Sequence, residues 1–179
     1  MALADELTAT MIANFLDESG GGFYSTAAGD QNLVMRVKED YDGAEPSGNA
    51  IAALNLLRLA ELRGNDEYRK LAESTLKTFA ARMASQPSAM PQMLVALLQS
   101  LTPPRQVVLA GEKTELKAMR DAYFSRFLPH HVVLWAGSVN LNPALAAMRE
   151  ATVPTAYVCE DFTCNLPVTQ VASLTPLLQ

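Results

Sequence analysis

The densest set of ionisable side chains in the sequence lies in one polar segment, residues 36–49. Its candidate functional groups are carboxylates, cations, a hydroxyl and an amide: Glu39, Asp42, Glu45, Arg36, Lys38, Ser47 and Asn49. Carboxylates beside cations and hydroxyls can orient a sugar or act as general acid and base, provided that burial separates their pKa values. The alternative is a solvated loop whose serine caps the following helix. Spacing alone does not distinguish the two.

A second pair of reactive residues is Cys159 and Cys164. They follow an apolar run, residues 155–159, which we expect to be a strand that ends beside Gly111 and Gly137. That would be the rim where parallel α/β sheets bind ligands. The spacing is not that of a thioredoxin-type Cys-x-x-Cys motif, and two thiols without a nearby histidine pair or a second cysteine pair make a poor zinc site. We therefore expect buried structural thiols or a disulfide in preference to catalysis.

Other motifs carry little chemistry. The pair His130-His131 opens a predicted strand with no carboxylate motif nearby, so it does not indicate a metal site. Residues 111–114 (GEKT) lack the earlier glycine and the adjacent glycine and lysine of a phosphate loop. Neither a serine-hydrolase elbow nor a dinucleotide fingerprint occurs. We predict no metal and no cofactor.

Composition narrows the class of protein further. The chain has 179 residues, a length that suits one domain or a domain with a subdomain. Its formal net charge is −5 and no cluster of Lys or Arg occurs, which argues against a nucleic-acid partner. Hydrophobic residues make up 49% and charged residues only 18%, so we expect some apolar surface to need a partner.

The N-terminal residues indicate a helix and not a secretory signal. Residues 1–15 have apolar side chains at helical spacing, carry Asp5 and Glu6, and lack a positively charged start. The longest uncharged stretches, residues 83–104 and 127–148, are interrupted by proline and polar residues, which argues against a membrane span. We therefore expect a cytoplasmic protein that makes no membrane contact.

Residues 1–102 are predicted to form a helical part. The helix over residues 1–15 ends at Gly20-Gly21-Gly22, and residues 23–26 and 32–37 are expected to form a short β-hairpin. Ser47 is expected to cap a helix that is buried on most sides, and Asp66 to cap a half-exposed one. An uncharged helix follows over residues 89–101. This alternation of inner and outer helices is typical of helical hairpins.

Residues 103–179 are predicted to form a small α/β subdomain after the boundary at Pro103-Pro104. We expect strands over residues 106–110, 131–135 and 155–159, and helices over residues 114–127 and 142–150. Apolar strands separated by helices favour a parallel βαβαβ arrangement with right-handed crossovers. The fold class is therefore α+β, mainly α.

Three stretches of the sequence carry a family resemblance. They are residues 21–26 (GGFYST); residues 38–39 (KE) and 42–49 (DGAEPSGN), leading into 52–60 (AALNLLRLA); and residues 156–159 (AYVC), 162–164 (FTC) and 167–169 (PVT). In order and spacing, over nearly the whole chain, they resemble the C-terminal end of the thioredoxin-domain-containing proteins related to spermatogenesis-associated protein.

Members of that family look like a thioredoxin-fold domain followed by a six-hairpin (α/α) toroid, similar to sugar-processing glycosidases and epimerases. The resemblance implies that this chain holds the helical hairpins of an incomplete toroid, as a C-terminal piece or a natural short relative. Redox activity of the thioredoxin-like domain does not carry over, because its residues are not in this chain. Residues 36–49 match the family's most recognisable toroid motif, which favours a pocket there.

Two hypotheses follow. In the first, the chain is the ligand-facing end of a toroid that binds a small carbohydrate-like ligand. The implied catalytic groups are Glu39, Asp42 and Glu45; the implied substrate-binding groups are Tyr24, which could stack on a sugar ring, Arg36, Lys38, Ser47 and Asn49.

In the second hypothesis, the chain is a non-catalytic packing or interaction module. Asp42, Ser47 and Asn49 then tie the turn before the buried helix. The partners implied by the resemblance are the upstream toroid and thioredoxin-like domains, and an apolar surface favours a homo-oligomer of the isolated chain. The few helices of this chain cannot close a six-hairpin toroid. We therefore expect the chain alone to be inactive.

Overall fold

The structure is a computed structural model, and it describes residues 2–29, 33–137, 142–161 and 163–178. The chain divides into two compact units. Unit 1 comprises residues 1–60 and 65–101, and unit 2 comprises residues 61–64 and 102–179. Helices and a small mixed sheet make this an α+β protein.

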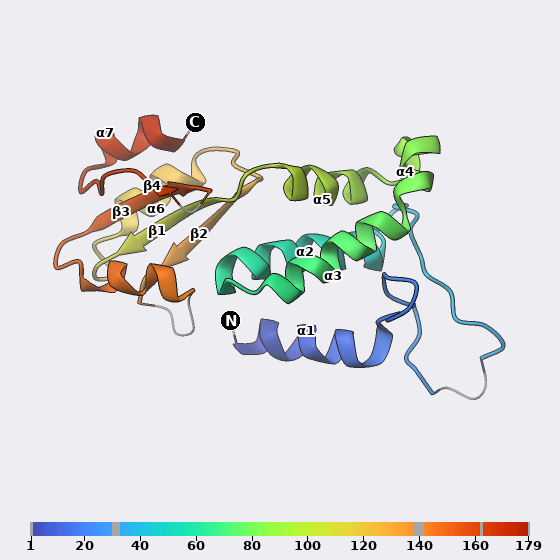
Figure 1. Cartoon of the computed structure of the whole chain (residues 1–179). Coiled ribbons are helices and arrows are strands. Elements are labelled where there is room, and N and C mark those ends of the chain that lie inside the picture. The colour runs from blue at the N-terminus through green and yellow to red at the C-terminus, as the bar shows by residue number, and fades with distance from the viewer. Residues whose placement is uncertain (1, 30–32, 138–141, 162, 179) are drawn as a thin grey trace. The chain divides into compact units, whose positions relative to one another are not determined.

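Unit 1 is helical (Figure 1). Its elements are α1 (Ala2–Phe15), α2 (Gly48–Arg63, whose last turn belongs to unit 2), α3 (Asp66–Thr78), α4 (Ala80–Ser85), the 3₁₀ turn η1 (Pro87–Ala89) and α5 (Pro91–Leu101). The helices predicted over residues 1–15, after Ser47 and over residues 89–101 are confirmed to within two residues at their ends, which is the usual uncertainty of helix ends. Helix α2 is buried on most sides, as its nearly continuous apolar surface predicts.

The helix predicted to follow Asp66 differs from the observed one in two ways. Its N-cap is Asn65, whose Oδ1 accepts from the backbone N–H of Glu67 at 3.0 Å and of Tyr68 at 3.4 Å. Asn65 is extended, as an N-cap must be, whereas Asp66 is already helical and favours the helix dipole by its charge. The apolar stripe that predicts this helix continues to Met83, but the helix ends at Thr78, because the backbone leaves helical geometry at Phe79 before α4 begins.

Two apolar clusters hold unit 1 together. In one, helices α2, α3, α4 and α5 and the short connections beside them contribute nearly inaccessible side chains: Ala50, Ala53, Leu54, Leu76, Phe79, Met83, Met90, Met93 and Ala96. In the other, Phe23 and the opposite side of α2 meet α1 and α3: Phe23, Ala52, Leu56, Leu57 and Ala72, with Met11, Ile12 and Phe15 packed against them. Helix α2 therefore lies at the centre of unit 1.

The predicted β-hairpin does not form among the described residues. Phe23 makes an isolated antiparallel bridge with Leu16, and Ser25 N–H donates to Val37 O, in the second predicted strand, at 2.8 Å. Gly21 and Gly22 have positive φ and turn the chain back onto the end of α1. The backbone of Phe23 is thus paired with α1 and α2 and not with a following strand; residues 30–32 of the predicted turn lie outside the described residues.

Unit 2 contains a four-stranded sheet. Its strands are β1 (Arg105–Ala110), β2 (His131–Trp135), β3 (Thr155–Glu160) and β4 (Thr163–Cys164), in the order β2-β1-β3-β4. Its helical elements are α6 (Lys117–Phe124), the 3₁₀ helix η2 (Pro143–Glu150), α7 (Val171–Leu174) and the 3₁₀ turn η3 (Thr175–Leu178). The three strands predicted from the sequence therefore form, each within one residue of its expected ends.

The predicted parallel arrangement is correct for β1 and β2 and wrong for β3. Strand β3 pairs antiparallel with β1, so Thr155 lies opposite Ala110 and Glu160 lies opposite Arg105. The chain enters β3 beside the end of β1, where the backbone of Pro154 lies against Gly111. A short apolar run that is buried on both faces is compatible with either direction, so its pattern does not encode the orientation.

Helical elements cover both faces of the sheet. Val107 and Leu109 face a cluster with α6, α7 and η3, in which Leu174 and Leu178 are almost inaccessible. Val108 faces the opposite side, toward Leu145 of η2, and Figure 1 shows η2 and α7 on opposite sides of the sheet. No helix in the described ranges is long and apolar enough to cross a membrane.

Candidate functional site

The segment predicted as a site is tied to the end of α1 by the cation Lys38. Its Nζ lies 2.7 Å from Asp17 Oδ2 and donates to Gly21 O at 2.5 Å. Tyr24 donates its hydroxyl to the same Asp17 oxygen at 2.9 Å, while Asp17 Oδ1 accepts from Ser19 and from Gly20 N–H. Asp17 is therefore the centre of this network. Sequence reasoning missed it, although an Asp before a Ser-Gly-Gly-Gly turn is a signal for such side-chain to backbone bonds.

These contacts determine the charge state of the network. The Lys38 ammonium, and after it the Gly20 N–H and the Ser19 and Tyr24 hydroxyls, hold the pKa of Asp17 well below its usual range. The same hydrogen bond to Asp17, with desolvation, raises the pKa of Tyr24. At neutral pH Asp17 is ionised and Tyr24 is protonated, so the pair does not exchange a proton near pH 7.

Arg36 covers one face of the Tyr24 ring. Its guanidinium carbon lies 4.0 Å from the ring centroid, and Lys38 Nζ lies 5.2 Å from it. Arg36 Nη2 also donates to Thr26 O at 2.7 Å and to Asn14 O at 3.1 Å. A sugar ring could stack on Tyr24 only at the face that Arg36 leaves open.

Asp42 joins two helices. Its Oδ1 accepts from Ser47 N–H at 2.7 Å, and its Oδ2 accepts from the N–H groups of Gln92 at 2.7 Å and Met93 at 3.3 Å. The latter two are N–H groups of the first turn of α5, which have no partner within their own helix. Asp42 thus ties the turn before α2 and caps α5 from a position 50 residues away in sequence.

Ser47 and Asn49 are buried and also bind backbone. The hydroxyl of Ser47 accepts from Ala50 N–H at 3.3 Å, which confirms the predicted cap of α2. Asn49 Oδ1 accepts from Phe23 N–H at 2.7 Å, and its Nδ2 donates to Phe23 O at 2.9 Å and to Glu39 O at 2.8 Å. Asn49 thus satisfies backbone groups that a β-hairpin would otherwise pair.

Three of the eight predicted site residues meet at one hollow of about 290 Å³. Tyr24, Glu39 and Asn49 line this hollow, which we call the Tyr24 hollow, together with apolar side chains that include Phe15, Phe23 and Ala52. Glu39 is exposed and also lines an adjoining hollow with Lys38. Asp42 and Glu45 line neither, so the three predicted catalytic carboxylates do not converge on one of these hollows.

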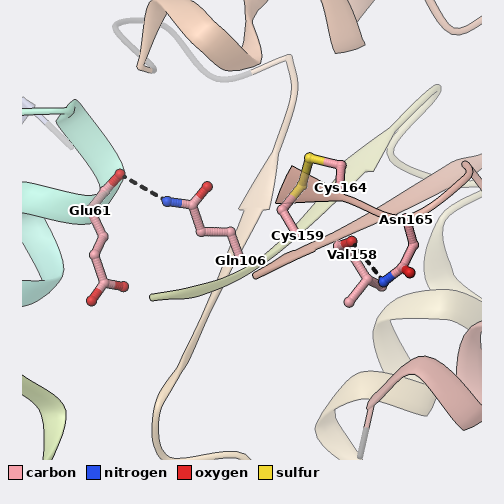
Figure 2. Close-up of a disulfide and its surroundings, with 6 residues drawn as sticks. All are labelled: Glu61, Gln106, Val158, Cys159, Cys164 and Asn165. Carbon is pink, nitrogen blue, oxygen red and sulfur yellow. Dashed lines mark hydrogen bonds between the residues drawn. A yellow bond between two sulfur atoms is a disulfide. The ribbon is translucent and has the colours of Figure 1, made fainter. Parts of the chain in front are cut away.

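Cys159 and Cys164 form a disulfide, one of the alternatives that the sequence left open (Figure 2). Its predicted location is wrong. Cys159 lies opposite Gln106, near the start of β1, whereas Gly111 follows the end of that strand. Because β3 runs antiparallel to β1, the pair lies at the end of the strands opposite the predicted ligand-binding rim. Cys159 is buried and Cys164 is exposed.

No group of three or more His, Cys, Asp or Glu side chains that could hold a metal ion occurs in the part of the chain that the structure describes. His131 shows how burial acts in this sheet: desolvation, with the nearby Arg105 charge, lowers the pKa of its imidazole.

Comparison with known proteins identifies relatives of the chain. Over 174 residues, 92% of this chain, it is 34% identical to spermatogenesis-associated protein 20 of Homo sapiens and 33% identical to that of Rattus norvegicus. The chain is homologous to spermatogenesis-associated protein 20. It spans only 22% of the length of that relative. An uncharacterized protein of Caenorhabditis elegans is 33% identical over 165 residues.

No family model and no solved structure matches the chain. The homology to spermatogenesis-associated protein 20 therefore supports the resemblance seen in the sequence, whereas the toroid and the thioredoxin-like domain remain predictions.

Proposed function

We propose that this chain is a non-catalytic packing module, corresponding to the C-terminal region of a longer protein related to spermatogenesis-associated protein 20. The observation that carries the proposal is an apolar groove of about 470 Å³ between α3, α4 and α5. Leu76, Ala80, Met83, Leu94, Leu97 and Leu101 line it, with Glu73 and Lys77 as its charged side chains.

The groove is suited to packing against another apolar surface. Helix α5 carries no charge, and Leu101 at its end is 73% exposed. Exposed apolar surface of this kind is typical of interaction sites. In longer relatives, the matching groove would be covered by the rest of the polypeptide, which exceeds the matched segment several-fold. The isolated chain would cover it by self-association.

The polar segment favours the same conclusion. Three of its side chains bond to backbone groups of unit 1: Asp42 accepts from backbone N–H groups, and Asn49 and Arg36 donate to backbone oxygens. These bonds are structural, and they leave Glu39 and Glu45 as the exposed carboxylates among the predicted acid and base groups. A packing module requires a loop held in place by such hydrogen bonds, and it does not require catalytic side chains that meet at one site.

Light scattering of the full chain at several concentrations tests the proposal. We expect a dimer or larger species for the wild type and a monomer of 19.4 kDa for Leu101→Glu, because a charge in the groove must be desolvated on packing. Leu166→Glu is the matched control: Leu166 is 86% exposed, does not line the groove, and its replacement adds the same charge. A monomeric wild type, or equal dissociation of both variants, would contradict self-association through the groove.

A second candidate function, binding of a small carbohydrate-like ligand, is favoured by the meeting of Tyr24, Glu39 and Asn49 at the Tyr24 hollow. In it, Glu39 would accept hydrogen bonds from sugar hydroxyls. Calorimetric titration with a panel of neutral monosaccharides tests this. This candidate predicts weak binding that Glu39→Ala abolishes and that Glu45→Ala, at another exposed carboxylate outside the hollow, leaves unchanged. Heat changes that are absent, or insensitive to Glu39→Ala, would rule this candidate out.

A further inference from the structure

The disulfide joins β3 to β4, and β4 is the last strand in the order of the sheet. Strands β3 and β4 pair antiparallel, with Glu160 opposite Thr163 and Cys159 opposite Cys164. Asn165 N–H donates to Val158 O at 2.9 Å, one position beyond the cysteines. The cysteines therefore occupy a pair that makes no backbone hydrogen bonds to each other, where opposed side chains are closest. Figure 2 shows the sulfur–sulfur bond bridging the two strands directly.

The two cysteine residues differ in their exposure to solvent. Cys159 is 1% exposed and lies opposite Gln106, in the interior of the sheet. Cys164 is exposed, on the short edge strand. Thiol–disulfide exchange requires a thiolate to reach one sulfur from the side opposite the bond that breaks, so access decides which sulfur is attacked. In this hairpin, Cys164 is the accessible one.

Other contacts hold the hairpin in place without the disulfide. Asn165 also donates its Nδ2 to Val158 O at 3.3 Å, and Asp161 N–H donates to Pro104 O at 2.9 Å. Further along, Ala156 and Val168 exchange two backbone hydrogen bonds, of 2.8 and 3.0 Å. The bond spans a sequence separation of only five, and a short loop loses less entropy on closure than a long one. Opening the bond should therefore leave the two thiols facing each other.

We propose that Cys159 and Cys164 form a reversible thiol–disulfide exchange site, with Cys164 Sγ as the atom that an external dithiol attacks. A thiolate of the dithiol bonds to Cys164 Sγ, the bond between the cysteine sulfurs breaks, and Cys159 leaves as a thiolate that takes a proton from water. The second thiolate of the reagent then attacks the mixed disulfide and releases Cys164, which is protonated in turn. The protein gains two electrons and two protons, and the dithiol becomes a disulfide.

This inference is independent of both functions proposed above. It also fits the predicted cytoplasmic location, because disulfides in reducing compartments are usually transient, catalytic or redox-sensing.

Reduction of the folded full chain by dithiothreitol tests the proposal. After alkylation with N-ethylmaleimide, mass spectrometry should show both cysteines modified without denaturant, with the far-ultraviolet circular dichroism unchanged. In a reduced sample that is not alkylated, oxidised dithiothreitol should restore the disulfide, so that N-ethylmaleimide modifies neither cysteine. Reduction that occurs only in denaturant, reduction that unfolds unit 2, or a purified chain whose free thiols do not oxidise would each overturn the proposal.

Single variants test which sulfur is attacked. Cys159→Ser leaves Cys164 as the free thiol, and Cys164→Ser leaves Cys159. In the folded protein, we expect Cys159→Ser to react with a chromogenic aromatic disulfide at least about tenfold faster, because only its remaining thiol is exposed. In denaturant the two variants should react at similar rates, which would show that the difference in rate between the folded variants is due to burial of Cys159. Equal rates in the folded state would contradict the assignment of Cys164.

Discussion

Replacement of Asp42 by alanine is the sharpest test of how the polar segment works. The change removes acceptors for Ser47 N–H and for the Gln92 and Met93 N–H groups at the start of α5. Loss of a helix cap costs about 1 kcal/mol. Loss of a hydrogen bond to a charged group costs about 1.5 kcal/mol or more. We therefore expect the free energy of unfolding to fall by about 2–3 kcal/mol, and the melting temperature by about 5–10 °C for a chain of this size.

Urea unfolding followed by circular dichroism measures this loss, with two matched variants. Asp42→Asn keeps one side-chain carbonyl acceptor, so it should lose about half as much stability. Glu45→Ala, in the same segment but exposed, should change the unfolding free energy by less than about 0.5 kcal/mol. If Asp42→Ala is as stable as Glu45→Ala, Asp42 does not join the two helices as the hydrogen bonds indicate, and its role as a cap is refuted.

Three further predictions concern the packing of unit 1. Folding lowers the pKa of Asp17 from 3.8, so the contacts of its carboxylate stabilise the fold above pH 3.8, and this stabilisation is lost as the pH falls toward the lowered pKa. The difference in unfolding free energy between wild type and Asp17→Asn should therefore shrink from about pH 6 to pH 2, and a constant difference would contradict this. Gly21→Ala and Gly29→Ala both place a side chain at positive φ, but only at Gly21 would the new Cβ lie 2.6 Å from the Ser74 and Thr78 hydroxyls. Chemical unfolding should therefore show that Gly29→Ala lowers the free energy of unfolding by about 1 kcal/mol and that Gly21→Ala lowers it by more; equal losses would mean that this close approach does not exist. In the same assay, Asn65→Ala should lower the free energy of unfolding by about 1 kcal/mol and Asp66→Ala by less, because the side chain of Asn65 accepts the capping hydrogen bonds of α3. The reverse order would indicate that Asp66 is the N-cap.

Much of the fold follows from local patterns in the sequence. Residues 131–135 form a strand with the predicted ends, and Ser47 caps α2 as predicted. Both depend on side-chain spacing and on bonds between neighbours, which a single stretch of sequence contains. The single-residue error at Asn65 has the same origin, because adjacent Asn and Asp residues are equally good caps and only the backbone conformation distinguishes them.

The candidate site was predictable only in part, because its hydrogen bonds join distant segments. The sequence left Asp42 open between a catalytic carboxylate and a tie for the turn before α2, and it did not indicate that Asp42 also accepts from α5. Asp17 was not singled out at all, although Lys38 and Tyr24 both bind it. A carboxylate in a polar segment has the same sequence pattern whether it faces a ligand or a helix N-terminus. The difference arises only when the loop closes.

The sequence by itself determined where α1, α2, α5 and the strands β1, β2 and β3 lie, because these depend on periods of two or of about 3.6 residues within one segment. It did not determine the pairing of Phe23, whose backbone bonds to Asn49 of α2 and not to a hairpin partner. Only the tertiary structure decided that β3 runs antiparallel to β1, and with it that Cys159 and Cys164 lie at the end of the strands opposite Gly111. Strand direction depends on how the connecting chain returns to the sheet. That path is set by the packing of whole elements, for which no local pattern exists.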